Sequence, residues 1–559
     1  MTTAPPLSRK QAAHTDVAAL RKPLVVPLGS RSYAKQFAQL YDYRLSYLNK
    51  RILHRAHAKW VQGFSSFSQS QSQAALAQGD QDDDHEDDDD DDDPGAHTEA
   101  GPSSRKRSRV SMAHPPKHTQ RILDVRQGEV CYIVGNLYCA MPLKPDVLED
   151  LTREQWLAPQ PARTKFVDPA RDELYIEDQS GRVKLVGDAI RPGGRLRPML
   201  ITGAVAAVLG TETRAGDFEV VDAVFASLPD ASPASAAKDE ASDDSVMDGG
   251  RDDDAADDGW VVIMSGLAIG GDDSLESEVA MQFLTEWLTG ELGSGEDREA
   301  SSKVVAAIIA GNSMAPPVRN EDETKTKRFG QDVPTYSAAP TLALDQFLTD
   351  LCSTMPVHIL PGERDPASVA MPQQPIHFAL LPRAGRFDSL HRETNPTWIG
   401  LDGCRILGTS GQNVDDIFKY VEEGDDGRVE MACRVLEWGH LAPTAPDTLW
   451  CYPFKATDPF LIRQRPDVMF LGNQPAYGTA LYRFDEDESG GGGGGGGDGD
   501  DDEGLEGHGS QGSPATAGRG WKGRACRVVL VPEFVKTHQV VLVNLRSLES
   551  RVVDVGTRI

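Results

Sequence analysis

Three short strings along this chain share one form, an apolar run that ends in a glycine turn. They are 308–313 (IIAGNS), 358–365 (HILPGERD) and 470–475 (FLGNQP). Apolar runs of this length that stop at Gly or Pro are typical of buried strands. The strings therefore predict strands whose ends present the polar residues of the turns.

Phosphoesterases that use two metal ions hold their ligands at such strand ends. Their two cations lie about 3.5–4 Å apart and are bridged by Asp, Asn and His side chains, in motifs such as Asp-x-His and Gly-Asn-His. In this chain, other residue types occupy those positions, and we expect no catalytic residue, no metal site and no cofactor. A scaffold of this kind is retained for what it binds. The degenerate positions are Ser265, Leu267, Asn312, Glu363, Arg364, Asn473 and Pro475.

Five other side chains could in principle rebuild a hydrolytic site, namely Asp365, Asp402, Asp447, Asp458 and His440. The Asp-Pro pairs at 365 and 458 are typical turn starters, and Asp-Gly at 402 is typical of a hairpin turn. Arg364 would place a permanent positive charge beside any cation. The string 408–411 (GTSG) lacks the Lys of a P-loop, and the chain contains no G-x-S-x-G elbow.

The acidity of the chain is concentrated in three tracts. The net charge of the whole chain is −29, and segments 80–93, 238–258 and 485–506 together carry a net charge of about −30. The rest of the chain is therefore electrically balanced. Tracts that repel themselves and bury nothing are expected to stay disordered.

The seven cysteines form no C-x-x-C pair, which favours buried thiols in a reducing compartment. The longest apolar stretch, 199–210, is too short to span a bilayer, and we expect no membrane contact. A basic cluster lies in a polar segment, where it is either a nuclear import signal or a solvated charge run. The cluster comprises Arg105, Lys106, Arg107 and Arg109.

An amphipathic helix is predicted over 31–62, where apolar side chains recur at steps of three or four without Gly or Pro. Its apolar face packs either on the core of this protein or on a partner protein. The face comprises Tyr33, Phe37, Tyr41, Leu45, Leu48 and Ile52. Between 119 and 230, short β-like runs with one helix near 145–156 favour a small barrel of the OB type. From 259 onward, strands alternate with helices, which predicts a layered α/β domain. The expected strands are 260–264, 304–310, 357–360, 405–407, 468–471, 528–531 and 540–545, and the expected helices lie around 278–288 and 342–351.

With these pieces in place, the chain resembles the small B-type subunits of eukaryotic replicative DNA polymerases, the delta type in particular. The strongest string is 443–449 (PTAPDTL), and the set follows the order of the family from about 130 to 548. The other strings are 135–138 (GNLY), 141–145 (MPLKP), 309–313 (IAGNS), 360–363 (LPGE), 371–375 (MPQQP), 407–413 (LGTSGQN), 451–454 (CYPF), 458–460 (DPF) and 542–548 (LVNLRSL).

The resemblance implies an OB-fold barrel packed on an inactive calcineurin-like phosphoesterase domain, a layered β-sandwich flanked by helices. It also implies a non-enzymatic regulatory subunit of the nuclear DNA polymerase delta complex, acting in replication and repair. Such a protein bridges the C-terminal cysteine-rich region of the catalytic subunit and a third, clamp-linked subunit, and it touches DNA at most indirectly. Two alternatives remain open, a single-stranded DNA-binding OB-fold protein and the B-type small subunit of another replicative polymerase.

The expected organisation combines these segments in order. It is a disordered N-terminus over 1–30, the helix over 31–62, a disordered acidic and basic linker over 63–118, the OB-fold domain over 119–230, a disordered acidic insert over 231–258, and the phosphoesterase-like domain over 259–559 with a Gly/Asp-rich disordered insert at 485–520.

Overall fold

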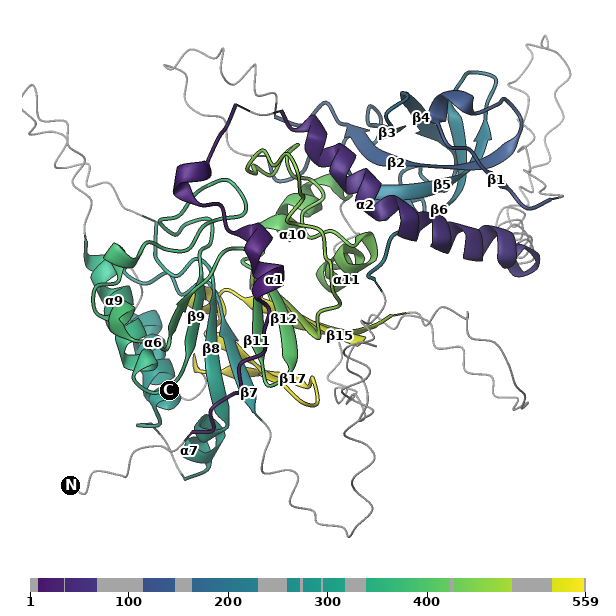
Figure 1. The fold of residues 1–559 in the computed structure, drawn as a ribbon. Coiled ribbons are helices and arrows are strands. Elements are labelled where there is room, and N and C mark those ends of the chain that lie inside the picture. The colour runs from purple at the N-terminus through teal and green to yellow at the C-terminus, as the bar shows by residue number, and fades with distance from the viewer. Residues whose placement is uncertain are drawn as a thin grey trace, which may run out of the picture. The chain divides into compact units, whose positions relative to one another are not determined.

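A computed structural model describes the parts of the chain that are drawn in colour in Figure 1. The acidic tracts, the basic cluster at 105–109 and most of the helix expected near 145–156 lie outside the described residues. The described residues are 9–34, 36–67, 114–145, 163–229, 259–271, 275–292, 295–316, 338–422, 427–484 and 525–556.

The chain divides into two compact units. The small unit comprises Tyr41–Leu143 and Val167–Ser227, and the large unit comprises Met1–Leu40, Lys144–Phe166 and Leu228–Ile559. The segment Lys144–Phe166 thus belongs to the large unit although both of its neighbours along the chain belong to the small one. Most of the predicted helix of 31–62 falls in the same unit as the β-rich region that follows it.

The small unit is built on one sheet of short strands. β2 pairs with both β3 and β5, and the pairing continues through β4 and β6, so that hydrogen bonding returns to the strand from which it starts. The weakest link is that between β4 and β6, which has only two residue pairs. The strands are β1 (Lys117–His118), β2 (Val130–Ala140), β3 (Glu173–Glu177), β4 (Arg182–Val186), β5 (Val205–Glu212) and β6 (Phe218–Phe225).

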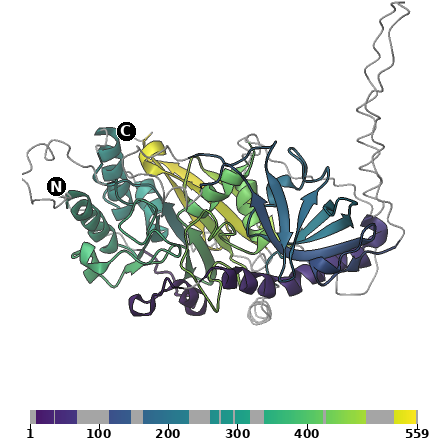
Figure 2. The same cartoon turned by 90° about the horizontal axis from the view of Figure 1, so that it is seen from above.

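The predicted amphipathic helix is α2 (Ala38–His57), which continues as a π-helix over Ala58–Gln62. Its fully buried side chains follow a spacing of four residues: Leu40, Arg44, Leu48, Ile52, Ala56 and Trp60. The helix runs along the sheet of the small unit (Figure 2). The Trp60 indole Nε1 donates a hydrogen bond of 2.8 Å to the buried Asp222 carboxylate of β6.

The apolar face predicted over 31–62 is therefore buried along α2 and exposed in the segment before it. Leu48 and Ile52 are buried in the small unit, and Tyr41 and Leu45 are half-buried. Tyr33 and Phe37 precede the helix and are 63% and 38% exposed. Arg44, which the apolar pattern did not include, is buried because its guanidinium donates to the carbonyl of Gly203 at 2.8 Å.

Two sheets form the centre of the large unit. The first sheet has the strand order β10-β9-β8-β7-β16-β17, and the second has the order β11-β12-β13-β15-β14. In the first sheet, β7 to β10 are parallel to one another, and β16 is antiparallel to both of its neighbours, β7 and β17. The strands are β7 (Trp260–Met264), β8 (Val304–Ala310), β9 (Val357–Leu360), β10 (Leu390–Arg392), β11 (Thr397–Leu401), β12 (Cys404–Thr409), β13 (Val468–Gln474), β14 (Gly478–Arg483), β15 (Ala525–Pro532), β16 (Gln539–Asn544) and β17 (Ser550–Asp554).

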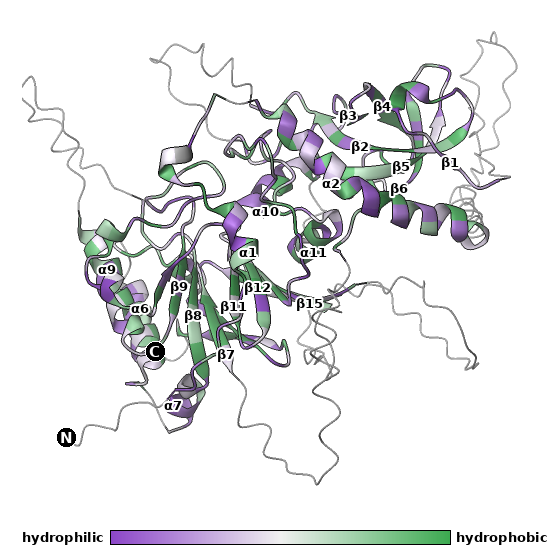
Figure 3. Ribbon diagram, viewed as in Figure 1, coloured by the Kyte–Doolittle hydropathy of each residue, from purple (hydrophilic) through white to green (hydrophobic). Residues whose placement is uncertain are grey.

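Alternating side chains of the central strands enter two separate apolar layers. Val261 and Ile263 of β7 pack with residues of the second sheet, whereas Val262 and Met264 face the helices α6 and α9. This follows from the pleat of a strand, which points successive side chains to opposite faces. Apolar strands accordingly fill the centre of Figure 3. The helices of the unit are α1 (Ala18–Arg21), α6 (Leu275–Thr289), α7 (Gly295–Ser302), α9 (Ala339–Cys352), α10 (Gln412–Ile417), α11 (Arg428–Trp438) and α12 (Phe534–Thr537).

The structure thus agrees with the prediction of a layered α/β domain after residue 259. The strands predicted at 260–264, 304–310 and 357–360 are present with those bounds. Strands β10, β11, β14 and β17 and helix α11 were not predicted. Among the described residues, no helix combines the length and the apolar character needed to cross a bilayer.

The expected disorder over 1–30 needs correction for the described residues of that range. The backbone around His14 forms an isolated antiparallel bridge with Leu401, so this segment extends the edge of the second sheet beside β11. The Thr15 amide donates to the Gly400 carbonyl at 3.1 Å, and the Asp402 amide donates to the Ala13 carbonyl at 2.8 Å. The segment shows no periodicity of its own, and its hydrogen-bond partners are almost 400 residues away in sequence.

Arg21 attaches the same segment to a buried carboxylate, that of Glu393. Glu393 is fully buried and forms an ion pair with Arg21 and a 3.0 Å contact with the Nδ1 atom of His358. Burial alone would raise the pKa of Glu393. The hydrogen bond and charge of His358, together with the charge of Arg21, outweigh that effect and lower the pKa below its ordinary value.

We expect Gly408→Ala to destabilise the large unit, because a Cβ atom at Gly408 would lie 1.8 Å from the ring of Phe470 on the neighbouring strand. Overpacking of this kind costs about 1–3 kcal/mol in the free energy of unfolding. Chemical denaturation of the full chain measures it. Gly385→Ala is the control, because the nearest atom to its Cβ would be 3.9 Å away. Equal stability of the two variants would contradict the packing described.

We expect Glu393→Gln to lower the free energy of unfolding near neutral pH by about 1–3 kcal/mol, because it removes the charged partner of Arg21 and His358. The lowered pKa of Glu393 stabilises the folded chain above the unfolded-state value of 4.5, and this contribution is lost as pH falls through the folded-state pKa.

The difference between wild type and Glu393→Gln should therefore shrink in acid, as measured by urea unfolding at several pH values. Asp388→Asn, which removes an exposed carboxylate from the nearby loop, is the control. A difference that stays constant down to about pH 3 would show that Glu393 is not stabilised by its cations.

Candidate functional site

The candidate site lies where parallel strands of both sheets end. β7, β8 and β9 of the first sheet and β12 and β13 of the second run into turns at their carboxyl ends. Asn312 lies in the turn after β8, and Asn473 lies near the end of β13 where its pairing with β15 is irregular; their φ angles are +52° and +55°. This left-handed conformation is tolerated by Asn better than by most residues, so both positions favour an amide side chain on backbone grounds alone.

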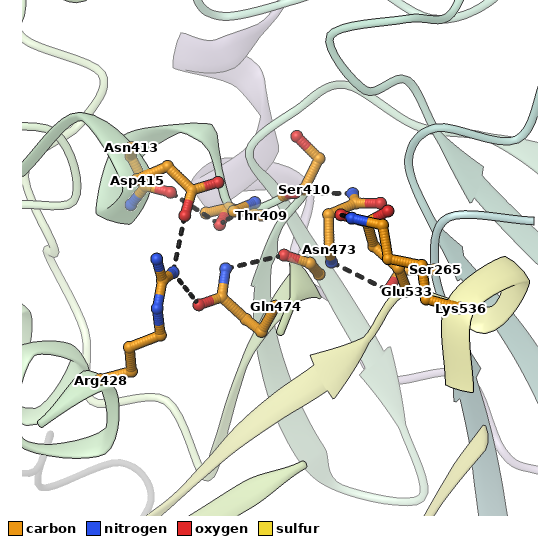
Figure 4. A network of polar contacts seen from close by, with 12 residues as sticks. Ser265, Thr409, Ser410, Asn413, Asp415, Arg428, Asn473, Gln474, Glu533 and Lys536 are labelled. Carbon is orange, nitrogen blue, oxygen red and sulfur yellow. Dashed lines mark hydrogen bonds and ion pairs between the residues drawn. The ribbon is translucent and has the colours of Figure 1, made fainter. Parts of the chain in front are cut away.

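The side chain of Asn473 links the two sheets (Figure 4). Its Nδ2 atom donates to the carbonyl of Ala310 at the end of β8, at 3.1 Å, and to that of Ser410 after β12, at 2.8 Å. The backbone amide of Asn473 donates in turn to the Oγ atom of Ser265 at 2.9 Å. Ser265, which follows β7, donates to the carbonyls of Val531 and Pro532 in β15, at 3.2 and 3.0 Å.

Glycines allow the backbones to approach closely enough for these bonds. A Cβ atom on Gly472 would lie 2.4 Å from the carbonyl oxygen of Ala310, and one on Gly311 would lie 2.6 Å from the Cβ atom of Ser410. Gly311 also has a φ angle of +82°. The glycine turns seen in the sequence are therefore points of contact between the two sheets.

A second set of contacts closes the loops after β8 and β9. The Oδ1 atom of Asn312 accepts a hydrogen bond from the amide of Arg364 at 3.0 Å. The buried Asp365 carboxylate accepts from the amides of Gly362, at 2.8 Å, and Met314, at 3.0 Å. Burial raises the pKa of Asp365, and these backbone bonds oppose the rise. Asp365 thus bonds its own turn, as its Asp-Pro sequence predicts.

The remaining degenerate positions lie apart from this network. The side chain of Leu267 is buried in the apolar layer beneath α6 and α9. Pro475 and the side chains of Glu363 and Arg364 are exposed. The structure therefore brings Ser265 and Asn473 into direct contact, joins Asn312 to Arg364 through the backbone, and separates Leu267 and Pro475 from them.

The rim of the site carries charged side chains. The Arg428 guanidinium donates to Asp415 at 2.7 Å and to the amide oxygen of Gln474 at 2.8 Å (Figure 4). Burial raises the pKa of Asp415, the charge and hydrogen bond of Arg428 lower it, and the charges of Glu363 and Glu533 raise it further, with a net rise. Glu533 is paired with Lys536 at 2.9 Å.

The sequence reading missed two buried amides that extend the network, Asn395 and Gln373. Asn395 Nδ2 donates to Ser410 Oγ at 2.6 Å and to Gln373 Oε1 at 2.8 Å, and the Ser410 amide donates back to Asn395 Oδ1 at 3.0 Å. Gln373 Nε2 donates to the carbonyls of Gly362 and Ser368 at 3.1 and 3.0 Å. The sequence signals were a Pro residue beside each amide and the string 371–375, which contains Gln373.

Two of the five side chains that could have rebuilt a hydrolytic site, His440 and Asp458, contact each other, and the other three lie in separate structural settings. Asp402 is in the hairpin turn between β11 and β12, as predicted. His440 Nε2 contacts the buried Asp458 carboxylate at 2.8 Å, and Asp447 is paired with Lys144 at 2.6 Å. Across the described parts of the chain, no three His, Cys, Asp or Glu side chains gather in a way that could hold a metal ion.

Comparisons with known proteins identify the family. A family model for the B-type subunits of DNA polymerases alpha and epsilon matches residues 261–479, and one described as DNA polymerase delta subunit OB-fold domain matches 36–223. The DNA polymerase delta small subunit of Arabidopsis thaliana is 34% identical over 439 residues, covering 78% of this chain and 85% of that protein. The chain belongs to the DNA polymerase delta small-subunit family.

Other relatives of the family agree with this assignment. The DNA polymerase delta subunit 2 of Drosophila melanogaster is 32% identical, with 76% of this chain and 83% of that protein covered. The DNA polymerase delta small subunit of Saccharomyces cerevisiae is 26% identical over 94% of this chain and 90% of its own length. The resemblance drawn from the sequence strings is confirmed, and the OB-fold prediction is confirmed by the matching family model.

We expect Asn473→Asp to destabilise the large unit of this family member by about 3 kcal/mol or more. The substitution keeps the size of the side chain and turns a donor into a carboxylate that faces two carbonyl oxygens. Asn473→Ala should cost less, because it leaves the carbonyls unpaired without adding charge. Denaturant unfolding measures both, and Gln346→Glu on the exposed face of α9 adds the same charge as a control. A variant Asn473→Asp as stable as that control would contradict the linking role of Asn473.

Proposed function

We propose that this protein is a non-catalytic accessory subunit of DNA polymerase delta. In this role it bridges the C-terminal cysteine-rich region of the catalytic subunit and a third, clamp-linked subunit during replication and repair synthesis in the nucleus. The large unit would then be an inactive calcineurin-like phosphoesterase domain, and the described β-strands of the small unit an OB-fold domain within 119–230. The named relatives support the proposal, because they are small subunits of this polymerase.

The observation that carries the proposal is the neutral hydrogen bonding at the strand ends. A two-metal phosphoesterase holds its cations at these strand ends with charged ligands. In this chain, the side-chain amide of Asn473 bonds two carbonyls there, and the hydroxyl of Ser265 bonds two others. Divalent cations such as Mg²⁺ and Mn²⁺ prefer carboxylate ligands, and zinc prefers His, Cys and carboxylates. The side chains at these positions therefore suit a structural link between the sheets, and the loops around them are available for protein binding.

The alternative of a single-stranded DNA-binding OB-fold has weaker support. Binding of this type needs free cations beside exposed aromatic rings. On the outer face of β3 and β4, Lys184 is paired with Glu173 at 2.7 Å and Arg182 with Glu177 at 3.5 Å. The hydroxyl of Tyr175 donates to Glu173 at 2.6 Å. Both cations of this face are already neutralised by neighbouring carboxylates.

Co-expression of the full chain with the catalytic and third subunits of DNA polymerase delta from the same organism tests the proposal. We expect one complex that contains all three proteins and withstands size-exclusion chromatography. Omitting this chain should separate the catalytic subunit from the third subunit.

Two results would overturn the proposal. One is a catalytic subunit that binds the third subunit equally well without this chain. The other is hydrolysis of a phosphodiester by the purified chain with Mn²⁺, at a rate that Asn473→Ala abolishes. The second result would show that the strand ends retain a working metal site despite their ligands.

A further inference from the structure

Five large apolar side chains are exposed together on the large unit. They lie on three segments that are far apart in sequence, and we call them the apolar patch. The patch comprises Val25, Leu28, Tyr33, Val369 and Trp450, which are 49%, 79%, 63%, 74% and 66% exposed.

Hydrogen bonds hold the first two segments side by side. The Val26 amide donates to Gln374 Oε1 at 2.9 Å, and Gln374 Nε2 donates back to the Leu24 carbonyl at 3.1 Å. The Gln374 amide donates to the Oγ atom of Ser368 at 3.3 Å, next to Val369. Val25 and Val369 are therefore carried by strands of backbone that are bonded to a common glutamine.

The third segment is bonded to both of the others. The Met371 amide donates to the Trp450 carbonyl at 2.8 Å, and the Tyr452 amide donates to the Met371 carbonyl at 2.8 Å. The Tyr452 hydroxyl accepts from the amide of Ser32 at 2.9 Å, and its ring meets that of Tyr33 edge to face at 5.5 Å. The three segments that carry the patch are thus joined to one another by hydrogen bonds.

The segments that carry the apolar patch bear mainly positive exposed side chains. Segments 22–33, 363–374 and 450–455 carry four exposed or half-exposed cations, against one exposed carboxylate, that of Glu363. Within the described parts of the chain, none of these cations forms an ion pair. We call these cations the positive rim; they are Lys22, Arg31, Arg364 and Lys455.

We propose that the apolar patch binds a segment of another polymerase subunit that presents large apolar side chains flanked by acidic residues. This inference rests on the proposed function, and it names the surface and the chemistry of the partner segment. Contiguous exposed apolar surface on a folded unit marks an interaction site, and Trp and Tyr are the side chains that contribute most to such interfaces. The positive rim selects acidic flanks through charge complementarity.

Two other occupants fit the patch less well. The acidic tracts of this chain at 80–93, 238–258 and 485–506 match the positive rim, but together they contain three large apolar residues, Val246, Met247 and Leu505, and so have little to bury against the patch. Single-stranded DNA binds by stacking bases on aromatic rings. Three of the five patch side chains, Val25, Leu28 and Val369, are aliphatic and offer no such platform.

The test is a binding titration of the immobilised full chain with purified catalytic subunit and, separately, purified third subunit of DNA polymerase delta. We expect the triple variant L28S/V369S/W450S to lose at least about tenfold in affinity for one of the two subunits and to keep the other. The matched control replaces three exposed apolar side chains elsewhere, as L123S/L342S/V552S, and should keep both affinities. Both variants should unfold at the wild-type temperature, because the replaced side chains are exposed.

A second variant tests the charge of the partner. R364E/K455E should weaken the same subunit's affinity and reduce the salt dependence of its binding. If wild-type chain binds neither subunit, the proposed function itself fails. If wild type binds both and the triple variant binds them equally well, only the patch inference fails. Two further results would contradict the patch inference. In one, the triple variant loses affinity for a single-stranded oligonucleotide and not for a subunit. In the other, the triple variant is a monomer where the wild-type chain is a dimer, and it still binds both subunits.

Discussion

The amide of Asn473 is the link on which the large unit depends. It bonds a carbonyl of β8 in one sheet and a carbonyl beyond β12 in the other, at the edge where five strands end. A pair of cations in this position would require charged ligands from several loops. A neutral donor between two carbonyls requires only that the backbones approach closely, and Gly311 and Gly472 make that approach possible.

The same polar network extends outward to the surface that we propose for binding. From Ser410 it continues through the buried amides of Asn395 and Gln373 to the carbonyl of Ser368, one residue before Val369. The Asn395 and Gln373 amides each bond through both their oxygen and their nitrogen, and bonding of this kind restricts the conformations of the loops that they join. A surface loop attached in this way is preorganised, which reduces the entropy that binding would otherwise cost.

Charge is distributed unevenly along the chain. The acidic tracts account for nearly all of the net charge, while ion pairs such as Lys184 with Glu173 neutralise the outer face of β3 and β4. The apolar patch differs because its four cations are left unpaired among the described residues. A balanced surface with one positive, apolar region favours recognition of a particular protein segment over general attraction to phosphate.

Local sequence patterns were sufficient to predict the strands at 260–264, 304–310 and 357–360, the helix through Leu48 and Ile52, and the position of Asn312 and Asn473 at strand ends. Each of these follows from the spacing or the run length of apolar residues and from the glycines that end the runs. Three findings needed the folded chain: Asn473 joins two sheets, Arg44 is buried, and the segment around His14 pairs beside β11 and holds Glu393 through Arg21. Those contacts join residues that are about 60 to almost 400 positions apart, and no local pattern records which distant groups will satisfy a given donor or charge.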